Sequence, residues 1–229
     1  MPDAPDGGTP ARPTATTPAT PGATAPAASK ATRPAPPSAA TRAAPPSAGT
    51  PAFDPHLYRE VLARFVTGVT VVTTLDERSD PPQPFGTTVN AFSAVSFEPP
   101  LVLVCIGRER SIRPVIGATG RFAVNILPEG SQDLSDCFAG APSELPRSAF
   151  CGAAYHRGTL GVPVLDASIA HLECRLEQEL ETGDHVVFIG RVEGLETHDV
   201  HGLPLLYYRR RYLRIERAAT AELLGKPEL

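Results

Sequence analysis

A succession of short strand-like segments, each closed by a turn signal, is the feature that most constrains the fold of this chain. Runs rich in Val, Ile, Phe and Thr recur from Val69 onward and are interrupted by Pro, Gly and Asp. No helix-sized segment alternates regularly with these runs, which argues against a doubly wound parallel sheet. Roughly seven short strands are most readily closed as a small, mostly antiparallel barrel. The sequence therefore predicts a mainly β fold with a few short helices.

Turn and capping signals set the boundaries of the expected elements. Asp54 is a plausible helix N-cap, Pro55 suits the first helical position, and Gly68 is expected to end that helix. The other expected elements are strands at 69–75, 85–95, 101–106 and 121–127, short helices within 111–120 and 131–140, an irregular stretch at 141–158, a long hairpin over 168–200 that turns at 182–184, a last strand or pair within 203–216, and a terminal helix within 217–229 that caps the domain or frays.

The composition changes abruptly near residue 52, and this change sets the predicted domain boundary. Residues 1–50 contain no Val, Ile, Leu, Phe or Tyr and hold 12 of the 26 prolines. Such a segment has no large apolar side chains to offset the entropy of ordering, so residues 1–52 are predicted to be a disordered tail. They lack the apolar run of a secretory signal, and a transit peptide is only weakly indicated because basic residues are few. The predicted domain spans residues 53–217, and a tail or short helix follows at 218–229.

Charge and cysteine usage narrow the class of function. After residue 52 the chain carries 23 acidic and 17 basic residues, which argues against a nucleic-acid surface. No apolar run reaches the roughly 18–20 residues of a membrane span. The cysteines, at positions 105, 137, 151 and 174, form no CxxC pair, and their spacing suits neither a zinc site nor a redox dithiol. A reducing, cytoplasmic setting fits this usage best.

Small polar residues interrupt the strand-like stretch that follows Pro84. Thr88, Asn90, Ser93 and Ser96 stand where a strand that only builds a core would carry Val or Ile. Residues two apart in a strand share a face, so Thr88 and Asn90 are expected to point the same way. The chain is expected to turn or bulge near 94–96. Small donors and acceptors beside free backbone N–H groups suit a flat polar heterocycle or a phosphate. Alternatively, Thr is an ordinary strand residue here, and Ser and Asn mark the approaching turn.

Several motifs, in order along the chain, carry a resemblance to a known family. The segments GTTVNAFSAVSFEPPLVLVCI, RERSIRP, GRFAVNIL and GDHVVFIGRV are similar to those of the flavin reductase family. The resemblance covers about residues 53–215 and implies an FMN-binding split barrel that forms a homodimer. It further implies the reductase partner of a two-component flavin monooxygenase, in which FMN or FAD lies at the subunit interface and takes a hydride from NADH or NADPH.

The resemblance also implies a set of flavin contacts. Thr88 and Asn90 are expected beside the ribityl chain and phosphate, and the backbone of 93–96 beside the pyrimidine edge. Ala91 and Ala94 stand where the family often has Ser, so one or two side-chain hydrogen bonds, each worth roughly 0.5–1.5 kcal/mol, would be absent. The full set of expected cofactor-binding residues is Thr88, Asn90, Ala91, Ser93, Ala94, Val95, Ser96, Cys105, Ile106, Arg110, Ser111, Arg121, Phe122, Asn125 and Tyr212.

Within that set, Arg110 and Ser111 match the family's phosphate-binding turn. A cation and a hydroxyl at the start of a helix make a sound anion site, although the residues alone also fit a solvated charged turn. His185 opens an apolar strand, where a lone His is usually a tolerated polar residue. The resemblance instead implies a catalytic His185 at the nicotinamide pocket, with Tyr212 nearby. The arginines at 209–211 could meet NAD(P)H phosphates or face solvent.

The sequence lacks the common motifs of metal sites and of nucleotide-binding sites. There is no metal-binding histidine motif, no GxGxxG and no P-loop, so neither a metal site nor a Rossmann dinucleotide site is expected. The resemblance implies an NAD(P)H:flavin oxidoreductase that requires no side-chain nucleophile and supplies reduced flavin to a partner monooxygenase. Two alternatives stay open, a non-catalytic flavin-binding or sensor module on the same barrel and a split-barrel oxidase with a different substrate.

Overall fold

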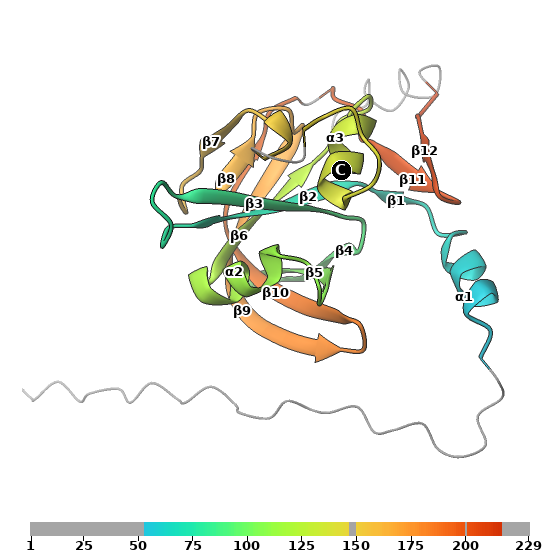
Figure 1. Ribbon diagram of the computed structural model, residues 1–229, viewed down its shortest axis with the longest axis horizontal. Coiled ribbons are helices and arrows are strands. Elements are labelled where there is room, and N and C mark those ends of the chain that lie inside the picture. The colour runs from blue at the N-terminus through green and yellow to red at the C-terminus, as the bar shows by residue number, and fades with distance from the viewer. Residues whose placement is uncertain (1–52, 147–149, 200, 217–229) are drawn as a thin grey trace, which may run out of the picture. The chain divides into compact units, whose positions relative to one another are not determined.

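The computed structural model describes residues 53–146, 150–199 and 201–216. This part of the chain is mainly β, with three short α-helices and one 3-10 helix among its strands, as expected from the sequence (Figure 1). The predictions for the tail at 1–52 and for a helix within 217–229 lie outside the described residues.

One antiparallel sheet of seven strands forms the centre of the fold. Its order is β3-β2-β6-β9-β10-β5-β4. The two edge strands, β3 and β4, are consecutive in the chain and only residues 90–91 separate them, so the sheet curls until its edges approach at that end. The strands are β2 (Thr70–Asp76), β3 (Gln83–Val89), β4 (Phe92–Phe97), β5 (Pro100–Gly107), β6 (Arg121–Ile126), β9 (Ala170–Thr182) and β10 (His185–Thr197).

Smaller elements surround this sheet. Two short sheets pair β11 with its neighbours β1 and β12, and β7 with β8. Their bounds are β1 (Thr67–Gly68), β7 (Tyr155–Arg157), β8 (Pro163–Leu165), β11 (Leu206–Tyr208) and β12 (Arg211–Leu213). The helices are α1 (Pro55–Leu62), α2 (Ile112–Thr119), α3 (Gln132–Ala139) and the 3-10 helix η1 (Phe150–Gly152).

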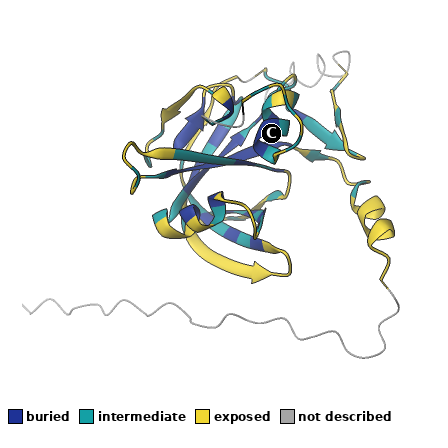
Figure 2. Cartoon of the chain, in the orientation of Figure 1, coloured by how far each residue is buried: buried dark blue, intermediate teal, exposed yellow. Residues whose placement is uncertain are grey.

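Apolar residues form two main clusters because β2 buries both of its faces. Val72 belongs to the cluster inside the curled sheet, together with Phe122 and Phe188. Its neighbour Val71 points the opposite way and packs in the cluster beneath α3, which includes Phe138. Figure 2 shows these buried strands in dark blue, whereas α1 is exposed along its length. Strand alternation thus explains how a single strand supports two layers.

The observed boundaries confirm most expected elements and correct two of them. Asp54 caps α1 by accepting a hydrogen bond from the His56 N–H at 2.8 Å, but the helix ends at Leu62 rather than near Gly68. The run 85–95 is two strands, since Asn90 and the following alanine leave the ladder. The expected bulge is confirmed, because the pairing of β4 with β5 shifts between Ala94 and Ser96.

The expectation about cysteine chemistry is wrong for one pair. Cys137 in α3 and Cys151 in η1 form a disulfide, with their Cα atoms 6.1 Å apart. The fold brings together two residues whose separation of 14 positions resembles no short dithiol motif. Cys105 and Cys174 lie in strands as free thiols, as expected. The spacing of cysteines along the chain does not show that α3 and η1 lie in contact, so it could not predict this disulfide.

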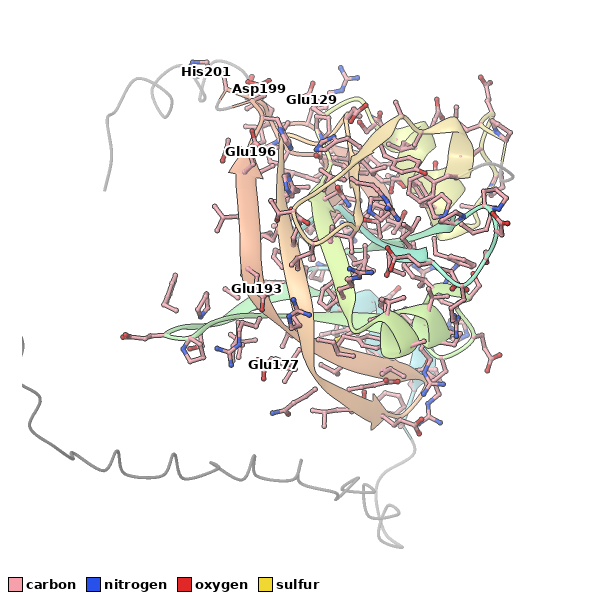
Figure 3. All side chains as sticks on the ribbon, turned by 90° about the vertical axis from the view of Figure 1, so that its left-hand side faces the viewer. Glu129, Glu177, Glu193, Glu196, Asp199 and His201 are labelled. Carbon is pink, nitrogen blue, oxygen red and sulfur yellow. A yellow bond between two sulfur atoms is a disulfide. The ribbon has the colours of Figure 1, made fainter. Side chains whose placement is uncertain are left out.

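The surface of the long β9–β10 hairpin is acidic. Figure 3 shows Glu177, Glu193 and Glu196 along it. Two of these carboxylates form exposed ion pairs, Glu177 with Arg191 and Glu193 with Arg175. Among the residues that the structure describes, no helix is long and apolar enough to cross a membrane.

Candidate functional site

Helix α3 covers the outward face of β3, where the polar row of the sequence begins. Thr87 and Val89 point into the core and are buried, while Gly86 and Thr88 point toward α3. The Thr88 hydroxyl donates to the Ser135 carbonyl in α3 at 2.6 Å. The predicted alternation is therefore confirmed up to Val89, and Thr88 fixes α3 on the strand.

A cavity of about 430 Å³ opens between β3, the start of α2, α3 and η1. It brings residues 83–87, which include Gly86 at the start of the predicted flavin segment, next to Arg110 and Ser111, at least 23 positions later in the chain. Thr88 and the predicted contacts from Asn90 to Ser96 do not line it. Aromatic rings and a disulfide form much of the opposite wall. Its lining residues are Gln83, Pro84, Phe85, Gly86, Thr87, Arg110, Ser111, Ile112, Cys137, Phe138, Gly140, Phe150 and Cys151.

Gly86 determines how closely the aromatic wall approaches β3. A Cβ at this position would lie 2.5 Å from Cε1 of Phe138 and 3.2 Å from Cε2 of Phe150. The two phenyl rings pack edge to face with their centroids 5.0 Å apart. Only glycine fits beneath this ring pair without displacing it, so the wall and the strand are matched to each other.

The start of α2 supplies the cationic part of the cavity. Ser111 is the helix N-cap, and its hydroxyl makes no capping hydrogen bond. The Arg110 guanidinium donates to the Ala139 carbonyl at 2.8 Å and has no ion-pair partner among the described residues. A free hydroxyl, a cation and helix N–H groups converging on one place are suited to bind a phosphate.

His185 lies on the outward face of the sheet beside this cationic corner. It pairs with Gly107, and a Cβ at Gly107 would lie 3.7 Å from Cγ of Arg110, so His185 and Arg110 flank the same glycine. The exposed imidazole has its Nδ1 2.8 Å from Oδ1 of Asp184. This hydrogen bond holds the pKa of Asp184 below its usual value. The carboxylate fixes the ring and leaves Nε2 available to a ligand.

The β3–β4 connection and β4 present most of the remaining predicted flavin contacts at the sheet edge. Ser96 is half-buried and accepts a hydrogen bond from the Glu98 N–H at 3.2 Å. The Ala91 carbonyl accepts a backbone hydrogen bond from Cys105 at 3.0 Å, which ties the connection to β5. Five residues of this segment are exposed: Asn90, Ala91, Ser93, Ala94 and Val95.

Three predicted contacts have side chains in the interior instead. Ile106 and Phe122 belong to the core cluster inside the sheet. Asn125 is fully buried: its amide donates to the Val71 carbonyl at 2.9 Å and to Thr73 Oγ1 at 3.0 Å, and its oxygen accepts from the Leu165 N–H at 2.8 Å. These hydrogen bonds occupy both the amide nitrogen and the oxygen of Asn125. They explain why a polar residue is buried in this strand without a contact to a ligand.

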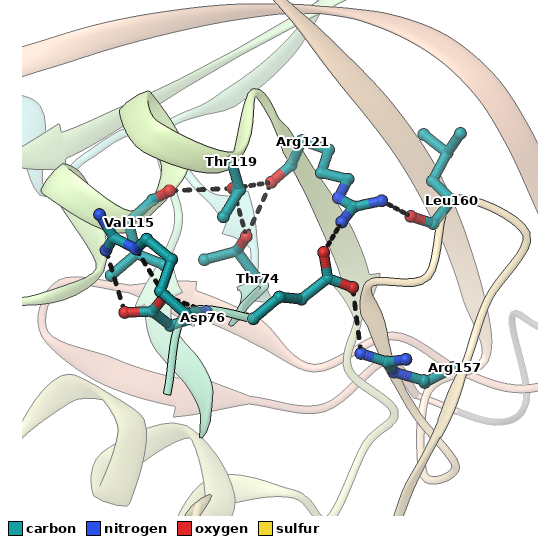
Figure 4. A network of polar contacts seen from close by, with 9 residues as sticks. Thr74, Asp76, Val115, Thr119, Arg121, Arg157 and Leu160 are labelled. Atoms are coloured by element: carbon teal, nitrogen blue, oxygen red, sulfur yellow. Dashed lines mark hydrogen bonds and ion pairs between the residues drawn. The ribbon is translucent and has the colours of Figure 1, made fainter. Parts of the chain in front are cut away.

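Arg121 is also occupied by the protein. Figure 4 shows its guanidinium donating to the Leu160 carbonyl, at 2.9 Å, and forming an ion pair with Glu77, which Arg157 also contacts. The network ties β6 to the loop between β7 and β8. It does not line the cavity beside β3, so the structure gives Arg121 a structural role.

The last two predicted contacts, Tyr212 and Cys105, do not line the cavity. The Tyr212 hydroxyl contacts Asp136 Oδ1 at 2.6 Å and Ser135 Oγ at 3.0 Å, and burial with the Asp136 hydrogen bond raises its pKa to about 12. Tyr212 therefore supports α3 as Thr88 does. Cys105 is half-buried on the outward face of β5, and burial raises the pKa of its thiol.

No local sequence pattern predicted the aromatic and sulfur wall of the cavity. Phe138 lies on α3 and Phe150 in a stretch predicted only as irregular, and neither carries a polar signal. The only sequence signal was Gly86, a glycine in the middle of a strand, which often marks a close approach by another element. The arginines at 209–210 line a separate cavity beside α1.

A histidine cluster lies apart from this cavity. His171 Nδ1 is 2.8 Å from His198 Nε2, and His156 is centred 6.5 Å from His171. The buried Glu173 beside them accepts from the N–H groups of Thr159 and Leu160. Within the described ranges no group of His, Cys, Asp and Glu is arranged to hold a metal ion.

Comparison with known proteins shows the family of this chain. A family model described as "Flavin reductase like domain" matches residues 62–216. The reductase subunit HsaB of a flavin-dependent monooxygenase from Mycobacterium tuberculosis (strain CDC 1551 / Oshkosh) is 38% identical over 177 residues, which cover 77% of this chain and 90% of HsaB. The structure of the NADH:FAD oxidoreductase SgcE6 of Streptomyces globisporus C-1027 with NAD and FAD fragments matches with a TM-score of 0.63 and 31% identity, covering 74% of this chain and 99% of SgcE6.

A third relative differs in length. A probable flavin reductase of Rhizobium meliloti (strain 1021) is 38% identical over 151 residues. These residues are 66% of this chain but 46% of that protein, so the chain spans about half the length of this relative.

Proposed function

The chain belongs to the flavin reductase-like family and is a flavin reductase, and we propose that it transfers a hydride from NADH or NADPH to FMN or FAD in the cavity beside β3. One observation supports this proposal: residues 83–87 line one cavity with Arg110 and Ser111, and His185 pairs with Gly107, which lies beside Arg110. Flavin, when bound, supplies the hydride acceptor.

The residues of the cavity fit a flavin by their chemistry. The unpaired Arg110, the free Ser111 hydroxyl and the N-terminus of α2 suit its phosphate. Gly86 and the phenyl rings of Phe138 and Phe150 suit an apolar part of the molecule, and the exposed backbone from 90 to 95 suits the polar edge of its ring system. Thr88 and Tyr212 act indirectly, because they position α3.

His185 is proposed to orient the nicotinamide. Its Nδ1 is held by Asp184, and the ring stands at the exposed turn between β9 and β10. A fixed imidazole can position the carboxamide of a dinucleotide while the cofactors carry the chemistry. Because FMN and FAD share the phosphate and ring contacts, and NADH and NADPH share the nicotinamide, the proposal covers both members of each pair.

We also propose that the curled sheet functions as a split barrel in a homodimer. α1 turns its polar face toward β11–β12, with the N–H of Arg209 donating to the Ala63 carbonyl, and it leaves its apolar face uncovered. The exposed large apolar residues on and directly after this helix are Leu57, Tyr58, Val61, Leu62, Phe65 and Val66. A second copy of the chain would cover this surface, as monomeric proteins rarely leave such an area exposed.

A monooxygenase is the proposed consumer of the reduced flavin. HsaB is named as the reductase subunit of such a system, and the cavity is open to solvent, so that reduced flavin can leave. Release of a diffusible product requires no contact between the two enzymes.

An assay of nicotinamide consumption tests the proposal. The purified chain is mixed with NADH or NADPH and with FMN or FAD in air, and the nicotinamide absorbance is followed against a protein-free control. We expect flavin-dependent oxidation with at least one pair. A protein that binds flavin but oxidises neither NADH nor NADPH would be a flavin-binding module, and the proposal would fail.

A further inference from the structure

The disulfide between Cys137 and Cys151 forms part of the wall of the flavin cavity. It joins α3 to η1 across 14 positions of sequence. Both cysteines are nearly buried, with exposed fractions of 4% and 5%, and both line the cavity. A reagent from solvent would therefore reach the sulfur atoms through the space assigned to the flavin.

The disulfide also holds the two rings that shape the cavity. Phe138 follows Cys137 directly, and Phe150 directly precedes Cys151. Their edge-to-face contact lies over Gly86 on β3. The bond thus links the two segments whose aromatic side chains form the wall opposite the strand.

The η1 side of this wall adopts a backbone conformation that depends on its surroundings. Phe150 has a φ of 59° and Cys151 a φ of 57°, in the left-handed region that residues other than glycine seldom adopt. Such conformations persist only where neighbouring contacts hold them. The disulfide is one of those contacts, so its loss would allow η1 and Phe150 to move away from β3.

The other two cysteines lack these properties. Cys174 is completely buried in the core inside the sheet, and burial with the nearby Glu173 charge raises its pKa to about 12. Cys105 lies on β5 and does not line this cavity. Among the described cysteines, only Cys137 and Cys151 line the cavity and also link the two segments that form its aromatic wall.

We propose that Cys137–Cys151 is a thiol–disulfide exchange site, that it takes a small thiol or dithiol through the cavity, and that its redox state sets the affinity for flavin. A thiolate of the dithiol attacks one sulfur, forming a mixed disulfide and releasing the other cysteine as a thiolate that takes a proton. The second thiol of the reagent then displaces the first cysteine. Two electrons pass to the protein, which ends with two thiols, and the reagent ends as a disulfide.

This inference rests on the flavin cavity of the proposed function, and it makes two linked predictions. Flavin in the cavity should cover the disulfide and slow its reduction. Reduction should also release the Phe150 wall and weaken flavin binding, by at least about fivefold if the coupling is of ordinary size, and by linkage bound flavin should make the disulfide harder to reduce at equilibrium.

The test compares the oxidised and the dithiol-reduced wild-type chain. FMN is titrated against each form by flavin fluorescence, and alkylation of Cys137 and Cys151 during reduction by dithiothreitol is followed by peptide mass spectrometry, with and without FMN. We expect weaker FMN binding by the reduced form and slower alkylation with FMN present. Circular dichroism of the reduced form checks that it remains folded.

Two variants separate this site from other effects of the reductant. The double variant Cys137→Ser, Cys151→Ser should bind FMN as weakly as the reduced wild type does. Its FMN affinity should not change when dithiothreitol is added. Cys174→Ala retains the disulfide and should respond to dithiothreitol as the wild type does. If the folded wild type binds FMN equally well in both redox states, this inference is overturned and the proposed function is not. An oxidised chain that binds neither FMN nor FAD, titrated in the same way, would overturn the proposed function and this inference with it.

Discussion

At the scale of single residues, Gly86 carries the strictest geometric requirement of the site. Gly86→Ala places a Cβ 2.5 Å from the Phe138 ring, so the wall must shift. We expect the free energy of unfolding to fall by about 1–3 kcal/mol and FMN binding to weaken. Gly68→Ala is the matched control, because nothing lies within 4 Å of its added Cβ. Chemical denaturation and FMN titration of both variants check this, and a fully stable Gly86→Ala chain with normal FMN affinity would contradict it.

Replacing His185 tests whether the nicotinamide and the flavin are bound by different residues. His185→Ala should slow flavin reduction or raise the KM for NADH or NADPH, while FMN affinity changes little, because the flavin contacts are assigned elsewhere. A lost interaction of about 1.4 kcal/mol would appear as a tenfold change. The control His201→Ala removes another exposed imidazole far along the chain. If His185 only begins a strand, stability should shift by roughly 0.5 kcal/mol and the reduction kinetics should stay unchanged.

The structure divides the predicted flavin contacts between the cavity, the sheet edge and the protein interior. Arg110 and Ser111 line the cavity, and their role as an anion site stays a prediction. Asn125 was expected beside the flavin because the resemblance implies that its strand lies there. Its partners are a carbonyl 54 positions earlier in the chain and an N–H group 40 positions later. A local sequence pattern does not reveal hydrogen bonds to partners so far away in the chain.

At the scale of elements, α1 poses the clearest question, since none of its residues is buried. Val61→Asp places a charge in the middle of its exposed apolar face. If that face packs on a second copy, the variant should be a monomer by light scattering while the wild type is a dimer. Because Val61 is 59% exposed in the single chain, monomer folding should change little. Glu60→Gln, on the polar face of the helix, should remain dimeric. A wild-type monomer, or a dimeric Val61→Asp, would contradict this account.

Strands were more predictable than the segments that cover them. The alternation of Thr and Val in β2 and β3 and the hairpin of β9 and β10 follow from local patterning, and most boundaries fell within a few residues. The wall formed by α3 and η1 was not predictable as a unit. Its cohesion comes from a disulfide and a ring pair between segments that have no mutual local signal.

At the scale of the whole molecule, acid should destabilise the fold in two stages. Burial and the nearby His198 hold the pKa of His171 below its usual 6.5. Burial alone would raise the pKa of Glu173, but hydrogen bonds from Leu160 and Thr159 outweigh it and hold that pKa below 4.5. In both cases the unfolded chain binds the proton more readily, so stability is lost as the pH falls, first below about 6.5 and further below about 4.5.

His171→Gln separates the first stage from the second. The variant removes the group that titrates near neutrality, so its free energy of unfolding should change less between pH 7 and pH 5, by up to about 1.4 kcal/mol per pH unit. The exposed His201→Gln should follow the wild type. Urea denaturation across this pH range measures the difference. An identical pH dependence in wild type and His171→Gln would remove His171 from the account.

Hydride transfer within the cavity is the central claim, and anaerobic stopped-flow spectroscopy tests it most directly. The chain with bound FMN or FAD is mixed with NADH or NADPH in the absence of oxygen, and the flavin and nicotinamide absorbances are recorded together. We predict that flavin bleaches at the rate at which nicotinamide is consumed, in equal amounts, and that deuterium at the transferred position of the nicotinamide slows both. Flavin that remains oxidised with either nicotinamide, although bound to the folded chain, would contradict the claim.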